Sequence, residues 1–221
     1  MDQKALIINI KFSEALFKTH STKGFRQTYL IPLPTSVAGI FGAMLGIERG
    51  KIIENFKDFF FGAKLLDYKG FYSENTTYIQ YKNRNVVRGV ATSIILNNPS
   101  YEIALAARSE IVNNIYLKLK NGIIYFPYGG QNDFFAENIN IVGIKDVEET
   151  YLIENYAPQD YVEKIEWDKG TELQILPVKH KLSPNLNFYF IFKGKLKLKE
   201  PIFAVDGIGL YSLEYFYYFE D

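Results

Sequence analysis

The order in which strand-like and helix-like patterns follow one another limits the folds open to this chain more than any single motif does. Residues 4–12 alternate between apolar and polar side chains, which predicts a strand with one well-buried face. Residues 65–68, 101–107 and 138–145 predict three more strands. Helical patterns lie between them, so we expect the chain to combine a sheet with helices.

The first helix is expected to follow Pro34, which enforces an extended entry, and to continue through Leu45. Thr35 or Ser36 is positioned to cap it. Three glycines fall at i, i+3 and i+7 of this helix: Gly39, Gly42 and Gly46. Because glycine lowers helix propensity, we interpret this stripe as a surface for close backbone packing against a sheet. The following residues lack the spacing of a phosphate-binding P-loop.

A shorter helical piece is expected over residues 52–61, and a second long helix is expected to begin at Ser109. The apolar face of the second helix consists of residues four apart: Ile111, Ile115 and Leu119. Asn121 and Gly122 are typical of a helix end. Both long helices therefore connect predicted strands.

Residues 76–96 lie between the two β-α-β patterns and read as two β-prone runs around a polar tip at 82–85. They predict a long protruding hairpin. The resulting order is the split βαβ plan of ferredoxin-like domains, which include the RNA-recognition-motif (RRM) fold. We predict an α+β fold, with an RRM-like βαββαβ domain over residues 1–148 and the hairpin as an insertion at about 76–97.

Helical periodicity is lost beyond about residue 150. Four runs there are β-prone: 173–178, 188–192, 195–199 and 211–219. Residues 149–221 are therefore expected to form a small, mainly β C-terminal part.

Charged residues are distributed unevenly, although the formal net charge is zero. Residues 15–47, 75–101 and 173–199 contain cations and no acid, while acids concentrate over residues 137–172. Such a chain can present one face to a polyanion and another to protein neighbours. A single segment of this kind is usually a solvated face or a strand edge protected by lysines. Three together favour a polyanionic partner.

Composition excludes several other classes of protein. With 221 residues, 48% of them apolar, the chain can bury a core. The absence of cysteine excludes disulfides and thiolate chemistry and agrees with a reducing compartment. The longest apolar run, 37–47, is too short to cross a bilayer, and no signal-peptide pattern is present. We expect a cytoplasmic protein without a membrane partner.

An RNA-backbone site is expected at the start of the first helix. The hydroxyls of Thr35 and Ser36 and the free amides of a helix N-terminus offer donors to phosphate, and the helix dipole adds favourable potential. Upstream residues can bind or neutralise neighbouring phosphates: Lys18, His20, Lys23 and Arg26. Phe25 or Tyr29 can stack on a base, as in recognition of single-stranded RNA.

Metal-free RNA cleavage is the alternative function, since it needs a general base for a 2′-hydroxyl and a cation for the phosphate. The adjacent pair Lys179 and His180 can supply both. Neighbouring residues on a strand point to opposite faces, however, which favours a surface His180 without catalysis. The two histidines stand 160 positions apart without a metal-binding or hydrolase motif, so no metal is expected.

The sequence around the first helix resembles the CRISPR-associated Cas five proteins of type I Cascade complexes. The main block matches the family's aromatic-Arg, Pro-Thr-x-x-x-Gly and Gly-Ala-x-Leu-Gly signature through strand 6–12, Phe25, Arg26, Tyr29, Pro32 and the runs 34–36 and 39–46. Weaker matches follow at 98–103 and 128–136. Together they cover roughly the first 140 residues.

This resemblance implies a non-catalytic subunit that binds the 5′ handle of the CRISPR RNA (crRNA) and contacts the backbone and large subunits of Cascade, with no cofactor and no small-molecule substrate. The hairpin would be the family's thumb, carrying four RNA-binding residues: Tyr81, Lys82, Arg84 and Arg88. One branch of the family cuts RNA with a Tyr, Lys and His set whose Lys-His pair lies in the thumb. Residues 76–96 contain no His, which favours binding without cleavage.

Overall fold

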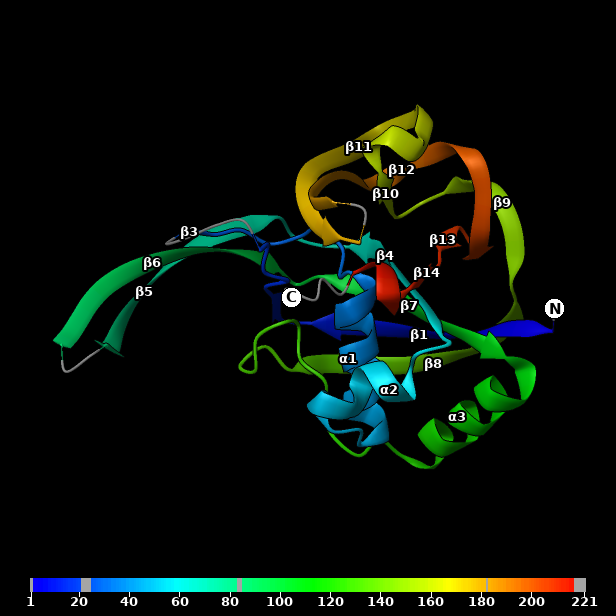
Figure 1. Ribbon diagram of the computed structural model, residues 1–221, viewed down its shortest axis with the longest axis horizontal. Helices are drawn as coiled ribbons and strands as arrows, with labels where there is room; N and C mark the ends of the chain where they lie inside the picture. Colours follow the sequence, from blue (N-terminus) through cyan, green and yellow to red (C-terminus); the bar gives the residue numbers. More distant parts are fainter. Residues whose placement is uncertain (1, 21–24, 83–84, 182, 217–221) are drawn as a thin grey trace.

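The structure is a computed structural model, and it describes residues 2–20, 25–82, 85–181 and 183–216. The chain is mainly β with three α-helices in these ranges, arranged as a body of two sheets and one long hairpin that extends away from it (Figure 1). This confirms the expected mixture of helices and sheet.

The central sheet is antiparallel and has the strand order β14-β4-β7-β1-β8. Its strands are β1 (Gln3–Phe12), β4 (Phe60–Asp67), β7 (Ser100–Arg108), β8 (Ala136–Asp146) and β14 (Tyr211–Ser212). Strand β1 lies inside this sheet between β7 and β8, and its side chains are buried along most of its length. The predicted strands 4–12, 65–68, 101–107 and 138–145 all overlap strands of this sheet.

The two long helices pack on one face of the central sheet. These are α1 (Pro34–Leu45) and α3 (Ser109–Asn121). Leu6 and Ile8 of β1 belong to the same buried cluster as Phe41 of α1 and Val112 of α3. The opposite face of β1 presents Ile7, which packs in a separate cluster. The alternation of strand side chains thus divides the core into two layers.

The helical piece predicted over residues 52–61 is shorter than expected. Helix α2 spans only Ile52–Asn55, preceded by a 3₁₀ turn, η1 (Arg49–Lys51), and β4 begins at Phe60. Phe56, Phe59 and Phe61 pack on one another with ring centroids 5.1–6.3 Å apart. This aromatic packing gives the segment a tertiary reason to leave the helix, which local periodicity does not show. No helix in the described ranges is long and apolar enough to cross a membrane.

The hairpin is longer than the predicted 76–97 insertion. It consists of β5 (Phe71–Lys82) and β6 (Asn85–Asn97), paired in register from Phe71 opposite Leu96 to Lys82 opposite Asn85. Its base is widened by two short strands that pair with β6, β2 (Glu14–Ala15) and β3 (Phe25–Arg26). Figure 1 shows the rest of the hairpin projecting from the body.

The C-terminal residues form a second sheet in the order β10-β12-β11, with β9 and β13 also paired to β12. Its strands are β9 (Glu148–Ile153), β10 (Tyr156–Pro158), β11 (Val162–His180), β12 (Ser183–Val205) and β13 (Ile208–Gly209). Short 3₁₀ turns, η2 (Gln159–Tyr161) and η3 (Leu213–Tyr215), complete it. Of the predicted strand 211–219, only β14 is a strand, η3 follows it, and residues 217–221 lie outside the described ranges.

The second sheet shares the core of the central sheet. Tyr156 and Phe190 are buried in the same cluster as Leu6. Val205 and Ile208 cover the other face of the central sheet beside Ile7. One apolar cluster contains residues from both sides of residue 148. The predicted division of the chain into two parts at that residue therefore stays a prediction.

Candidate nucleic-acid interface

Helix α1 begins one turn earlier than the predicted hydroxyl cap requires. Its N-cap is Leu33, without a side-chain cap, and Pro34 occupies the first turn. The amides of Ser36 and Val37 both donate to the Leu33 carbonyl, at 2.9 and 3.0 Å. The predicted capping by Thr35 or Ser36 is therefore wrong. Pro34 has no N–H and a fixed φ suited to the first helical position, so the helix starts there.

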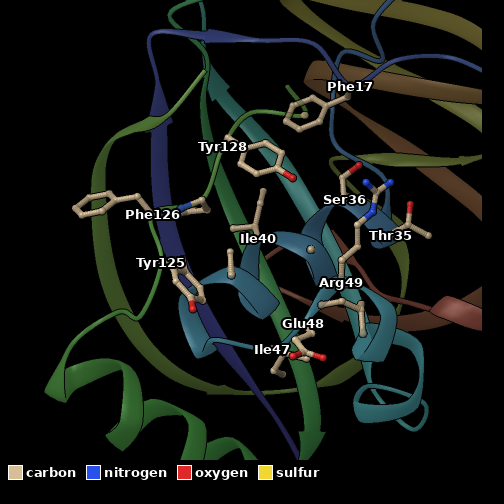
Figure 2. Close-up of a pocket in the computed structure, with 15 residues that line it drawn as sticks. Phe17, Thr35, Ser36, Ile40, Ile47, Glu48, Arg49, Tyr125, Phe126 and Tyr128 are labelled. Atoms are coloured by element: carbon tan, nitrogen blue, oxygen red, sulfur yellow. The ribbon is translucent and has the colours of Figure 1, made fainter. Parts of the chain in front are cut away.

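Thr35 and Ser36, whose side chains do not cap the helix, line a pocket of about 620 Å³. The pocket lies between α1, the turn that follows it and the loop after α3 (Figure 2). Its lining comprises Phe17, Thr35, Ser36, Gly39, Ile40, Ala43, Ile47, Glu48, Arg49, Ile52, Tyr125, Phe126, Pro127, Tyr128 and Gly130. This volume lies within the range of ligand pockets, about 300–1,000 Å³.

One side of the pocket is polar and cationic. Thr35 and Ser36 are half-buried there, and Figure 2 shows the head group of exposed Arg49 directed toward the same side. The neighbouring acid, Glu48, also lines the pocket, and among the described residues it pairs with Lys51 at 3.4 Å. A guanidinium, two hydroxyls and the positive end of a helix dipole together favour an anion such as phosphate.

The other side of the pocket is an aromatic loop, residues 123–130. Tyr125 and Phe126 are 64% and 63% exposed, and Tyr128 is also exposed. The backbone of this loop is fixed to α1, because the amides of Ile124 and Tyr125 donate to the carbonyls of Met44 and Ala43 at 2.9 and 3.2 Å. Exposed rings on a fixed backbone can stack on bases without first being ordered.

Two glycines allow the aromatic loop to approach the base of the hairpin. A side chain on Gly129 would lie 2.8 Å from the carbonyl oxygen of Glu14, and one on Gly130 would collide with the carbonyl of Leu16. Gly130 also has a φ of +83°, which disfavours other residues. The loop and the start of β2 are consequently in backbone contact, with the amide of Leu16 donating to the Gly129 carbonyl at 2.8 Å.

The predicted glycine stripe of α1 does not pack on a sheet. Gly39 is exposed and lines the pocket, with open space where a side chain would be. Gly42 packs against Ile52 of α2, and Gly46 ends the helix with a φ of +72° beside Ile124. The stripe interpretation was wrong because the three glycines serve three different neighbours, and helical spacing alone does not identify neighbours.

The described parts of the basic segment, residues 18–20 and 25–28, lie beside the base of the hairpin. Lys18 is exposed and forms an antiparallel bridge with Thr28. Exposed Phe25 and half-buried Arg26 form β3, opposite Thr92 and Ser93 of β6. His20 lies 3.1 Å from Asn185 and 3.4 Å from the Tyr29 hydroxyl. Lys23 lies outside the described residues.

Tyr29 does not fit the predicted stacking role. Its side chain is 4% exposed, and its ring stacks on Phe190 at a centroid distance of 5.2 Å. The hydroxyl donates to the Pro177 carbonyl at 2.8 Å, and burial raises the pKa of this phenol well above its usual value. The C-terminal sheet occupies the face that a base would need. Phe25 is exposed, so its stacking role stays a prediction.

Two of the predicted hairpin residues, Tyr81 of β5 and Arg88 of β6, lie on the strands that project from the body (Figure 1). Tyr81 is 80% exposed and pairs with Val86, and exposed Arg88 pairs with Ile79. Directly paired residues of an antiparallel ladder share a face, so Tyr81 and Arg88 lie on the same side of the hairpin. Lys82 is the last residue of β5, and Arg84 lies outside the described residues.

His180 is neither at the surface nor in an open catalytic position. Its side chain is 5% exposed, and its ring stacks on Tyr215 at 5.6 Å, with Phe188 and Phe216 at 5.8 and 5.6 Å. Burial lowers the pKa of this imidazole below its ordinary value. Lys179 is half-buried on the opposite side of β11. The burial of His180 among aromatic rings disfavours the cleavage alternative, which stays a prediction.

The pocket includes functional candidates that the sequence did not single out: Arg49, Tyr125, Phe126 and Tyr128. A signal was present, because residues 121–132 hold no charge and three exposed aromatics directly after an amphipathic helix. Arg49 had none, since it lies in a short charged turn like many others. Of the predicted site residues that the structure describes, Thr35 and Ser36 alone line the pocket.

The fold defines a class of proteins with an antiparallel central sheet, a covering second sheet and a projecting hairpin. Solved structures are similar to this fold. One is a chain of a CRISPR RNA-guided surveillance complex, with 15% identity and a TM-score of 0.51 over 89% of this chain and 91% of that one. At this identity the likeness establishes the fold.

Weaker similarities point to other CRISPR-associated structures. A chain of the type III-B Cmr-beta complex bound to cognate target RNA and AMPPnP matches with 12% identity and a TM-score of 0.42 over 88% of this chain and 86% of that one. A CRISPR-associated protein matches with 12% identity and a TM-score of 0.40 over 91% and 96%. Neither protein-family models nor curated proteins match the sequence.

Proposed function

We propose that this protein is a non-catalytic RNA-binding subunit of a type I CRISPR Cascade complex, and that it binds the 5′ handle of the crRNA. The observation that carries the proposal is the pocket at the start of α1. It combines an anion-binding side, with Arg49, Thr35 and Ser36, and an exposed aromatic side, with Tyr125 and Tyr128. Phosphate contacts together with stacking platforms are what single-stranded RNA requires.

The topology of the central sheet supports an RRM-like assignment. The elements β1-α1-β4 and β7-α3-β8 are two β-α-β units, and the sheet order β4-β7-β1-β8 with both helices on one face corresponds to the ferredoxin-like plan. RNA-recognition motifs bind bases on the free face of the sheet. Here that face is covered by Val205, Ile208 and Leu210. The RNA path we propose therefore follows the pocket and the hairpin instead.

The partners we propose follow from the shape of the chain. The hairpin carries exposed Tyr81, Ile79 and Val86 on one face of a projecting arm. Exposed apolar side chains of this kind are typical of protein contacts. We assign the arm to a contact with the backbone subunit of the complex and other exposed surfaces to the large subunit.

Arg49 provides the direct test of the pocket. Arg49→Gln removes the cation and keeps a polar side chain, so the affinity for a single-stranded RNA that begins with the handle should fall about tenfold, corresponding to one lost charged contact of 1–2 kcal/mol. Fluorescence anisotropy measures this. Lys57→Gln is the matched control, because Lys57 is an exposed cation eight residues further along the chain and does not line the pocket. Equal losses in both variants would count against the pocket.

Handle recognition needs a second comparison. The affinity for the handle-bearing RNA should exceed that for an unrelated RNA of equal length, and both should weaken as salt increases. Equal affinities would refute the handle assignment while leaving general RNA binding in place. The purified chain should leave repeat RNA intact in EDTA. Cleavage that His180→Ala abolishes would establish the endoribonuclease alternative instead.

A further inference from the structure

The side chain of Gln174 in β11 hydrogen-bonds to the backbone of the residues that lead into α1, as a neighbouring strand would. Its Oε1 accepts from the Leu30 amide at 2.8 Å, and its Nε2 donates to the Thr28 carbonyl at 3.1 Å. One side-chain amide thus satisfies a backbone donor and a backbone acceptor two residues apart. Gln174 lies on the face of β11 that continues into buried Leu176 and Val178.

Two more contacts attach the same segment to the C-terminal sheet. Tyr29, between the two residues that Gln174 binds, donates from its hydroxyl to Pro177 at 2.8 Å and stacks on Phe190. His20 lies 3.1 Å from Asn185 through its Nε2. The attachment is therefore made by both strands, β11 and β12, and among the described residues it involves His20 and residues 28–30.

Thr28 connects the segment held by Gln174 to Lys18 of the basic segment. Its backbone forms the antiparallel bridge with Lys18, and its hydroxyl accepts from the Phe17 amide at 2.9 Å. The Thr19 amide donates to the Gln27 carbonyl at 2.9 Å, which extends the pairing by one residue. Phe17 also lines the pocket. The position of exposed Lys18 relative to the pocket thus depends on Thr28.

We infer that Gln174 is a positioning residue for RNA binding: through it the C-terminal sheet holds residues 28–30 and, by their pairing, residues 17–19, and so sets where Lys18 meets the RNA backbone. The inference rests on the proposed function, because it assigns Lys18 a phosphate. It also gives the second sheet a role beyond covering the first. Among the described residues, both hydrogen bonds of the Gln174 side chain are to protein backbone.

A double-mutant cycle tests this inference. Gln174→Leu keeps the size of the side chain and removes both hydrogen bonds, and Lys18→Gln removes the cation. The probe is a labelled single-stranded oligouridine RNA. Lys18→Gln should weaken its binding about fivefold in the wild-type background. In the Gln174→Leu background the same substitution should change the affinity very little, because a lysine that is no longer positioned already contributes little to binding. Additive losses would mean that Gln174 only stabilises the fold, and would overturn the inference.

Hydrogen exchange gives a readout that does not depend on RNA. The amides of residues 17–30 should exchange faster in Gln174→Leu than in the wild type, whereas Ile175→Ala, on the exposed side of the same strand, should leave them unchanged. Unchanged exchange in Gln174→Leu refutes the positioning role. If that variant does not fold, Tyr29→Phe, which removes the hydroxyl contacts to the Pro177 carbonyl and to His20 and keeps the ring on Phe190, should show the same coupling with Lys18. If the wild type binds no RNA but the amides still exchange faster in Gln174→Leu, the proposed function is refuted. The hold of Gln174 on this segment then still stands.

Discussion

Gly39 shows how a single residue can serve the pocket at the expense of the helix that carries it. It is exposed in the middle of α1, and nothing lies within 4 Å of the position of an added side chain. Alanine is favoured over glycine inside a helix by about 1 kcal/mol. The residue is therefore suboptimal for stability, and its place in the lining of the pocket offers a reason.

We expect Gly39→Ala to raise the free energy of unfolding by about 1 kcal/mol and to weaken RNA binding, because the added methyl group enters the pocket. Urea denaturation measures the first effect and fluorescence anisotropy the second. Gly50→Ala is a useful control, since it also has open space but lies outside the pocket lining. A stabilised Gly39→Ala variant with unchanged RNA affinity would show that the RNA does not enter this part of the pocket.

At the same scale, the residues of the candidate site were only partly predictable. Thr35 and Ser36 were found because a Pro-Thr-Ser run marks a helix start, which is a local property. Tyr29 was misjudged, because its burial depends on Phe190, a contact made 161 positions along the chain. Arg49 was missed for the same kind of reason. A pocket is made by distant residues, and a local pattern identifies only those whose own neighbours reveal them.

Among the secondary-structure elements, the hairpin is the one whose removal can be designed most cleanly. Thr92 donates from its hydroxyl to Asn75 at 2.8 Å, and buried Ile95 and Leu96 lie between this pair and the body. Beyond Asn75 and Thr92 most described side chains of the hairpin are exposed, so that part of the arm adds little to the core. The structure thus divides the hairpin into a structural base and a projecting arm.

Replacing residues 76–91 by an Asn-Gly turn should therefore leave the body folded, with a Tm within a few degrees of the wild type. The shortened chain should fail to copurify with the other subunits of its complex, because the apolar face around Tyr81 and Ile79 is gone. Calorimetry and affinity purification measure the two effects. Retention in the complex would show that the arm is dispensable for assembly.

The elements themselves were predicted better than their limits. The alternation of residues 4–12 and the runs around 101–107 and 138–145 identified strands of the central sheet. In a half-buried strand every second side chain faces the core, so apolar residues recur at every second position. The helix predicted over 52–61 failed after Asn55, where three phenylalanines pack on one another. The long strands β11 and β12 were predicted only in pieces, since register shifts interrupt their alternation.

At the scale of the whole molecule, two kinds of contact join the sheets. One is the shared apolar cluster that includes Tyr156 and Phe190. The other is a polar seam centred on Lys64 of β4, which lies 3.5 Å from Glu102 and 3.3 Å from Glu154 of the second sheet's border. Neither is visible in the sequence, because a lysine and two glutamates are ordinary surface residues until the sheets meet.

The aromatic surroundings of His180 couple this architecture to pH. The ring is buried among Phe188, Tyr215 and Phe216, so its pKa in the folded chain lies below the value of about 6.5 expected in the unfolded chain. Between the two values the unfolded chain binds the additional proton. The contribution of neutral His180 to the free energy of unfolding is therefore complete above about pH 6.5. It decreases as the pH falls toward the pKa of the folded chain, and below that pKa the decrease stops.

Replacing the titrating ring by a non-titrating one of similar shape isolates this effect. His180→Phe keeps a ring against Tyr215, so the difference in Tm between wild type and variant measured at pH 8 reports packing alone. As the pH falls from 7 to 5, the wild type should lose Tm faster than the variant, because only the wild type buries a group that the unfolded chain protonates. Carboxylates titrate in both proteins and cancel in the comparison. Parallel Tm curves would show that His180 is protonated equally in both states, and that the aromatic surroundings open in solution.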